Sequence, residues 1–124
     1  MNSPFIDRAV KEAEKVEHKF RLGAVIHKGG RLLSIGRNYY QRSARNLHPR
    51  YSPWAGSIHA EVDAILKAKK DLKGASLTIV RINKDKQLML ARPCTHCMLY
   101  LKHAGIKRIY YSTSSYPYEE VENL

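Results

Sequence analysis

The sequence predicts an α/β domain in which helices and strands form layers, with at least one pair of parallel strands. Two observations predict it. Apolar residues recur at helical spacing in several segments, and short β-rich runs lie between these segments. In the second half of the chain helices alternate with strands, an order typical of crossover connections between parallel strands. No repeat, low-complexity tract or linker interrupts residues 1–124, so we expect a single domain.

The first half of the chain predicts one helix and one hairpin. Ser3-Pro4 is a helix-initiating pair, and the apolar residues after it recur at helical spacing to about Lys19. Two short apolar runs, 22–27 and 32–35, flank a Lys-Gly-Gly sequence, which predicts a β-hairpin. Residues 38–56 have no clear periodicity, and so long a loop in a compact domain is usually functional or disordered.

The second half predicts helices that alternate with strands. A helical pattern begins at Ser57 and continues until Gly74. The β-rich run 77–82 predicts a strand, and a turn separates it from a short strand at 87–91. The last expected elements are a helix at 94–103 ended by Gly105, a strand at 106–111 and a short helix near 118–123.

The composition is that of an ordinary globular protein. Hydrophobic residues make up 44% of the 124 residues and charged residues 27%. No run approaches the roughly 18 apolar residues of a membrane span. Acidic residues among the apolar residues of the N-terminal segment are atypical of a secretory signal. We therefore expect a cytoplasmic protein that does not enter a membrane.

The charge is strongly positive and unevenly distributed. There are 22 Lys and Arg residues against 11 Asp and Glu, a formal net charge of +11. No acidic residue lies between Glu17 and Glu61, or between Lys86 and Tyr118. A positively charged surface attracts polyanions, which favours a phosphate-bearing ligand at or near the site. A basic surface without a specific ligand would give the same pattern, and charge alone does not separate a nucleotide from a polynucleotide.

Four residues, His59 and Glu61 followed by Cys94 and Cys97, form the chemically informative pattern. The two cysteines are three positions apart at the start of a predicted helix, where the helix dipole favours thiolates. His59 begins another predicted helix. One His and two Cys are the ligand count of a catalytic zinc site, which keeps one position open. A carboxylate beside that position, but not on the metal, is placed to transfer protons.

The pattern H-x-E followed by P-C-x-x-C resembles the signature of the zinc nucleobase deaminases. On it the chain is identified as a member of the cytidine and deoxycytidylate deaminase superfamily, and the resemblance covers most of the length. It implies a three-layer α/β/α fold with a mixed sheet of four or five strands and helices on both faces. It also implies a homo-oligomer. The matching segments are 23–26, 36–38, 59–66, 93–97 and 105–111.

The resemblance also implies roles for single residues. Glu61 would carry protons between a zinc-activated water and the ring, with attack at C4 of cytosine or C6 of adenine. The backbone N–H groups of Ala60 and Cys94 would hold the base and the attacking oxygen, and Asn38 would contact the sugar. The Zn²⁺ ligands would be His59, Cys94 and Cys97.

Departures from the family pattern leave the substrate open. Asp63 stands where deoxycytidylate deaminases commonly have Asn, and the stretch 81–92 is longer than in the tRNA-type enzymes. Only 13 residues follow Tyr111, fewer than the final elements of the relatives that act on polynucleotides. The leading expectation is deamination of cytosine to uracil, with release of ammonia, on a (deoxy)cytidine nucleotide such as deoxycytidylate. The alternative is a cytosine or adenine deaminase acting on single-stranded DNA or RNA, including tRNA.

Each motif also has an alternative interpretation that involves no catalysis. A redox pair or a structural half-site would explain the two cysteines but leaves His59 and Glu61 without a role. A catalytically silent zinc-stabilised module is disfavoured because it would not need Glu61. His96 as a fourth ligand would close the metal to water.

The loop 37–54 interleaves arginines with aromatic residues and is either a substrate lid or a loop packed on the body. As a lid it would place Arg45 and Trp54 against the substrate.

Overall fold

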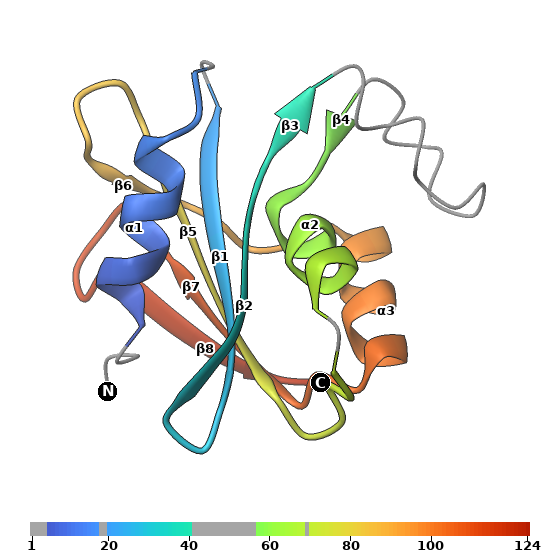
Figure 1. The fold of residues 1–124 in the computed structure, drawn as a ribbon. Helices are drawn as coiled ribbons and strands as arrows, with labels where there is room; N and C mark the ends of the chain where they lie inside the picture. The colour runs from blue at the N-terminus through green and yellow to red at the C-terminus, as the bar shows by residue number, and fades with distance from the viewer. Residues whose placement is uncertain (1–4, 18–19, 41–56, 69) are drawn as a thin grey trace.

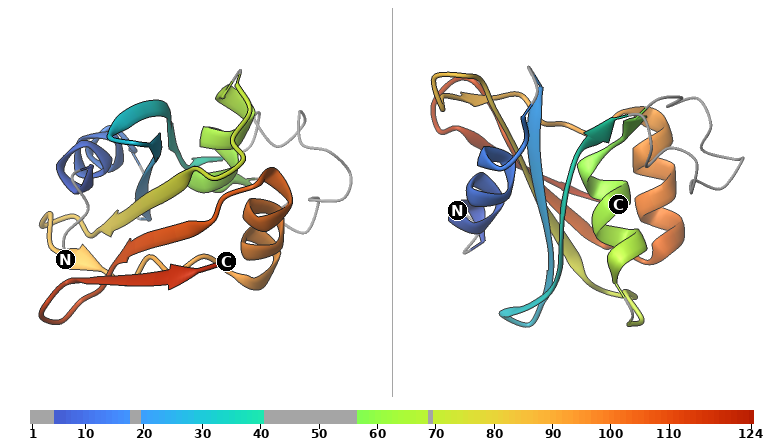
Figure 2. Two further views of the ribbon diagram at one scale, coloured as in Figure 1. Left: turned by 90° about the horizontal axis from the view of Figure 1, so that it is seen from below. Right: turned by 45° about the horizontal axis from the view of Figure 1, so that its top comes forward.

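The computed structural model describes residues 5–17, 20–40, 57–68 and 70–124. A mixed sheet has one helix, α1 (Ile6–Glu14), on one face and two, α2 (Ala60–Lys67) and α3 (Thr95–Ala104), on the other (Figures 1 and 2). The expected α/β/α fold with helices on both faces is therefore confirmed.

The main sheet has six strands rather than four or five. Its order is β2-β1-β5-β7-β8, and β6 pairs with β5 beside this path. β5 and β7 are parallel, with α3 in the connection between them, and the other pairs are antiparallel. The strands are β1 (Arg21–Lys28), β2 (Arg31–Arg37), β5 (Ser76–Ile82), β6 (Leu88–Met89), β7 (Arg108–Ser112) and β8 (Glu119–Asn123).

The hairpin between β1 and β2 forms where the sequence predicts it. Lys28 pairs with Arg31, so Gly29 and Gly30 make a two-residue turn. Their φ angles are +58° and +79°. Two consecutive left-handed residues match the twist of the strands in such a hairpin, and glycine adopts them without strain.

The helix expected from Ser57 to Gly74 is shorter in the structure. Ala68 already has extended backbone after α2, and residues 57–58 form the strand β4 (Ser57–Ile58), which pairs with β3 (Tyr39–Tyr40). Gly74, with φ +79°, donates its N–H to the carbonyl of Gly105 at 2.8 Å. Gly74 therefore turns the chain into β5 instead of ending the helix.

The short helix expected near 118–123 is wrong, because this segment is β8. It pairs antiparallel with β7, with Tyr110 opposite Val121. The Tyr111 hydroxyl donates to Glu120 Oε2 at 2.6 Å, which ties the two strands together on one side. Glutamate-rich sequence favours a helix when isolated, but pairing along the open edge of β7 outweighs that preference.

Two apolar clusters hold the layers together. Val25, Val80 and Ile82 point to the α1 face and pack on Ala9 and Ala13. Side chains that alternate with them fill the larger cluster under α2 and α3; among its members are Ala24, Ile26, Leu77, Ile79, Leu101 and Ile109. In the described part of the chain, none of the helices has the length and apolar character needed to cross a membrane.

Candidate active site

α2 is fixed tightly against β2. An added Cβ at Gly36 would lie only 2.4 Å from the Ala60 carbonyl oxygen and 2.4 Å from the Ala64 nitrogen, so helix and strand backbones are almost in contact. Ser34 Oγ donates to the Ala64 carbonyl at 2.7 Å, and Asp63 Oδ2 accepts the Arg37 N–H at 3.0 Å. These contacts fix the N-terminus of α2 relative to the sheet.

The three expected metal ligands meet where two helices begin. His59 is the N-cap residue of α2 and Cys94 that of α3, and Cys97 lies in the first turn of α3. One ligand atom from each residue lies within 4.8 Å of the others. His59 Nδ1 and Cys97 Sγ are 3.2 Å apart. The structure thus brings together residues that are 38 positions apart in the sequence.

This set of donors fits zinc. Ligand atoms around a tetrahedral Zn²⁺ are about 3.5–3.8 Å apart, given bond lengths of about 2.0–2.3 Å. The one ligand pair with a hydrogen-bond distance, His59 Nδ1 and Cys97 Sγ at 3.2 Å, is slightly closer than this. Burial raises the pKa of the Cys97 thiol, so a thiolate there needs a bound cation to stabilise it. His96 is not in the group of potential ligands found among the described residues.

Glu61 lies beside these ligands and is almost completely buried, with 2% of its surface exposed. Its Oε1 atom has no hydrogen-bond partner in the described structure. Burial raises the pKa of Glu61 to about 7, while hydrogen bonds with its own backbone and with Cys97 act in the opposite direction. A cation held by the ligands would lower this pKa again. A buried carboxylate oxygen without a partner is costly, which indicates that it awaits a ligand.

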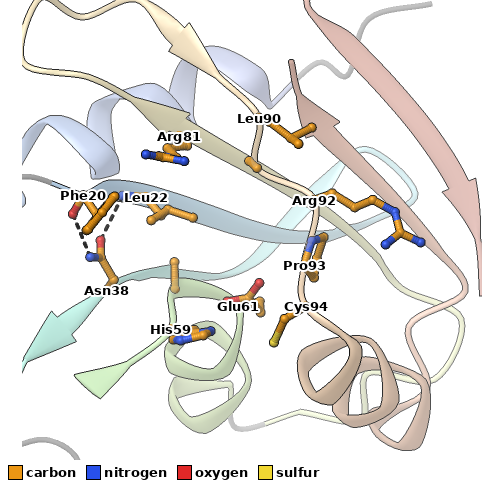
Figure 3. A pocket seen from close by; sticks show the side chains of 12 residues that line it. Phe20, Leu22, Asn38, His59, Glu61, Arg81, Leu90, Arg92, Pro93 and Cys94 are labelled. Carbon is orange, nitrogen blue, oxygen red and sulfur yellow. Dashed lines mark hydrogen bonds between the residues drawn. The ribbon is translucent and has the colours of Figure 1, made fainter. Parts of the chain in front are cut away.

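A cavity of about 310 Å³ opens in front of these residues (Figure 3). His59, Ala60, Glu61 and Cys94 form the part of its wall near the ligands. β1, the end of β5 and the segment before α3 form the rest. The other lining residues are Phe20, Leu22, Asn38, Arg81, Leu90, Ala91, Arg92 and Pro93.

Asn38 lines the cavity, but its amide group already makes structural bonds. Its Oδ1 accepts the Leu22 N–H at 2.9 Å, and its Nδ2 donates to the Phe20 carbonyl at 2.8 Å (Figure 3). A contact between Asn38 and a sugar stays a prediction. Arg45 and Trp54, the other expected substrate contacts, lie outside the described residues, as does most of the expected lid.

The two arginines of the cavity wall were not singled out as site residues by the sequence. Arg92 bonds Glu122 through two nitrogens, at 2.7 and 3.1 Å. Arg81 lies over the ring of Phe20, with its guanidinium carbon 4.9 Å from the ring centre. A signal existed for Arg81, which is the one charged residue of β5. The partner of Arg92 is 30 residues away and gives no local signal.

The chain was compared with known proteins. The model of the cytidine and deoxycytidylate deaminase zinc-binding region matches residues 1–113. An uncharacterized deaminase in the luxG 3' region of Aliivibrio fischeri is 30% identical over 93 residues, which are 73% of this chain and 56% of that protein. This chain therefore matches little more than half the length of that relative.

Solved structures share the fold. The apo dCMP deaminase of cyanophage S-TIM5 superposes with a TM-score of 0.61 at 24% identity, covering 91% of this chain and 86% of that one. A diaminohydroxyphosphoribosylaminopyrimidine deaminase/5-amino-6-(5-phosphoribosylamino)uracil reductase from Thermotoga maritima gives 0.58 at 26% identity, covering 90% of this chain and 29% of that one.

The match to the family model extends over nearly the whole chain and includes all four residues of the motif. The three ligands that this motif predicts converge in the structure. Together these findings confirm Zn²⁺ as the expected cofactor. The chain belongs to the cytidine and deoxycytidylate deaminase zinc-binding family.

Proposed function

We propose that this protein removes the amino group of a cytosine base by hydrolysis, on a deoxycytidine or cytidine nucleotide. The observation that carries the proposal is the convergence of His59, Cys94 and Cys97 beside Glu61, whose Oε1 has no partner among the described residues. His59, Glu61 and Cys94 line the same cavity. A structural zinc site would be closed by a fourth protein ligand and would not need a buried carboxylate.

His59, Cys94 and Cys97 would hold a zinc ion, which would supply the Lewis acidity that makes water a nucleophile at neutral pH. Glu61 does the proton transfer. Its Oε1 accepts a proton from the attacking water and passes it to the ring nitrogen. Glu61 then takes the remaining proton from the hydroxyl added at C4 and delivers it to the leaving amino group. The water oxygen becomes the new carbonyl at C4, the C4–N bond breaks and ammonia leaves.

The base is held by the start of α2. Ala60 is fully buried and is the first residue of this helix, so its backbone N–H is one of the helix donors without an acceptor in the helix. Ala60 lines the cavity together with Glu61, and we assign to its N–H the carbonyl oxygen of the pyrimidine. The helix dipole favours the negative charge that develops on this oxygen.

A mononucleotide is supported by two further observations. The cavity volume is at the low end of the range for small-molecule sites, about 300–1,000 Å³. The cyanophage dCMP deaminase was crystallised with dCMP and dUMP, and its fold matches this chain with a TM-score of 0.57 at 23% identity.

The test is the substitution Glu61→Gln, assayed by ammonia release from dCMP. We expect turnover to fall at least about 100-fold, because an amide cannot accept the proton. Zinc content should stay at about one ion per chain. Asp63→Asn is the matched control, since it makes the same change on the same helix and the amide oxygen can still accept the Arg37 N–H. Turnover that survives in Glu61→Gln would contradict the proposal.

The positive charge of the whole chain favours a second candidate, a deaminase acting on single-stranded DNA or RNA. Each phosphate contact with a polynucleotide releases counterions, so binding would weaken steeply with salt. We therefore propose to compare dCMP with a short oligodeoxycytidine and a tRNA anticodon loop at several salt concentrations. Faster turnover of a strand than of dCMP, with a steep salt dependence, would favour this second function.

A further inference from the structure

Among the described residues of the cavity wall, only one strong positive charge is not already paired with a carboxylate. His59 is assigned to the metal, and the Arg92 guanidinium is held by Glu122 on β8. Arg81 contacts an aromatic ring instead, and no carboxylate partner is found for it in the part of the chain that the structure describes. The described wall therefore offers a single uncompensated guanidinium.

The contact with Phe20 leaves the donors of Arg81 available. A guanidinium that lies over an aromatic ring uses its flat face, and its N–H groups point outward along its edges. Those edges match the geometry of a phosphate or carboxylate, which accepts two parallel hydrogen bonds. Phe20 thus supports the Arg81 guanidinium without occupying its hydrogen-bond donors.

The position of Arg81 is fixed by the fold. It is the second-to-last residue of β5 and lies opposite Leu22 of β1 and Met89 of β6. Its backbone N–H donates to the hydroxyl of the buried Ser112 at 3.0 Å, and that hydroxyl donates to the Met89 carbonyl at 2.6 Å. The backbone of Arg81 is therefore held by three neighbouring strands, β1, β6 and β7.

Arg81 lies across the cavity from the reacting groups. Figure 3 shows Glu61 and Cys94 at one side and Arg81 with Phe20 at the other, with Leu22 between them. A base that reaches Glu61 directs the rest of the substrate toward Arg81. The group that meets Arg81 is then the end of the molecule farthest from the base.

We propose that Arg81, supported by Phe20, binds the phosphate of a nucleoside monophosphate and so makes this protein select nucleotides over nucleosides. The inference rests on the proposed function and names its substrate class. A mononucleotide carries one phosphomonoester, which a single guanidinium matches, whereas a strand presents a series of phosphates that the described wall does not match.

The test measures both binding and turnover with the zinc-loaded protein. Binding of dCMP and of deoxycytidine is measured by calorimetry in the Glu61→Gln background, where no turnover interferes. We expect Arg81→Gln to weaken dCMP binding about ten- to a hundredfold and to leave deoxycytidine within about twofold, because one charged hydrogen-bonding group is lost. Phe20→Leu should act in the same direction, about two- to fivefold, since the ring only supports the cation.

The control is Arg31→Gln, which removes the same charge from the hairpin end of the sheet, opposite Lys28. It should leave both affinities unchanged, and thermal unfolding should show that every variant is folded. Equal weakening of dCMP and deoxycytidine by Arg81→Gln would overturn the proposal. So would a larger effect of Arg81→Gln on a short oligodeoxycytidine than on dCMP.

The results separate this inference from the proposed function. If wild-type protein releases no ammonia from any cytosine substrate, but Arg81→Gln selectively weakens dCMP binding, the function is wrong and the phosphate site stands. If wild-type protein deaminates dCMP, and Arg81→Gln does not change its preference over deoxycytidine, the phosphate site is wrong and the function stands.

Discussion

Substituting Gly36 with Ala should damage the metal centre through the backbone of α2. A Cβ at this position would lie 2.4 Å from the Ala60 carbonyl oxygen and 2.8 Å from the Ala64 Cα, whereas ordinary contacts begin at 3.4 Å. Both atoms belong to the helix backbone, so no side chain can rotate away. The start of α2, with His59 and Glu61, must move by about 1 Å from the sheet, and overpacking of this kind costs about 1–3 kcal/mol.

Gly23 provides a matched control on the other face of the sheet. A Cβ there would lie 2.0 Å from the Ala9 carbonyl oxygen and 2.6 Å from the Ala13 nitrogen, so Gly23→Ala displaces α1 instead of α2. Both variants should lose similar stability, roughly 10 °C in melting temperature. Only Gly36→Ala should also misplace catalytic groups, and a shift of about 1 Å can reduce turnover about 100-fold.

The assays are zinc affinity, by competition with a chromogenic chelator, and ammonia release from dCMP, both well below the melting temperatures. We expect Gly36→Ala to bind zinc at least about tenfold more weakly than wild type, and Gly23→Ala to bind it normally. If the two variants lose zinc affinity and turnover equally, the stability of the whole domain controls the site, and our reasoning about α2 is refuted.

Two other predictions concern stability. Burial lowers the pKa of His27, whose Nε2 lies 2.8 Å from Thr78 Oγ1, so folding favours its neutral form. The contribution of His27 to the free energy of unfolding is complete above pH 6.5. It is lost as the pH falls below that value, by at most about 1.4 kcal/mol per pH unit. In urea titrations His27→Gln should flatten this slope relative to wild type, and an unchanged slope would contradict the assignment. The variant Cys97→Ala should bind no zinc. A chelator should lower the melting temperature of the wild type but not that of the variant, because metal binding is coupled to folding. A chelator effect on the variant would show another zinc site.

The parts of the fold that the sequence predicted correctly depend on local signals. The two glycines of the β1–β2 turn and Gly105, with φ +97° after α3, need left-handed backbone that glycine adopts most easily. The convergence of His59, Cys94 and Cys97 was predictable because their motif contains the residue types that zinc binding requires.

The wrong predictions concern long-range contacts. Nothing in the sequence of 119–123 indicates that β7 has an open edge, so the glutamates there suggested a helix. For the same reason the bond between Arg92 and Glu122 was not foreseen, because it depends on β8 lying beside β7. The arrangement of Arg81 over Phe20 likewise needs the sheet, since the two residues belong to distant segments of the chain.

His59 and Cys94 occupy N-cap positions, and neither side chain makes a capping hydrogen bond. Serine, threonine or aspartate there would accept a bond from the helix N–H groups and add about 1 kcal/mol of stability to each helix. The chain therefore has two candidate zinc ligands at positions where capping side chains would stabilise α2 and α3. Zinc binding at these two positions would then offset part of that missing stability, because metal binding is coupled to folding.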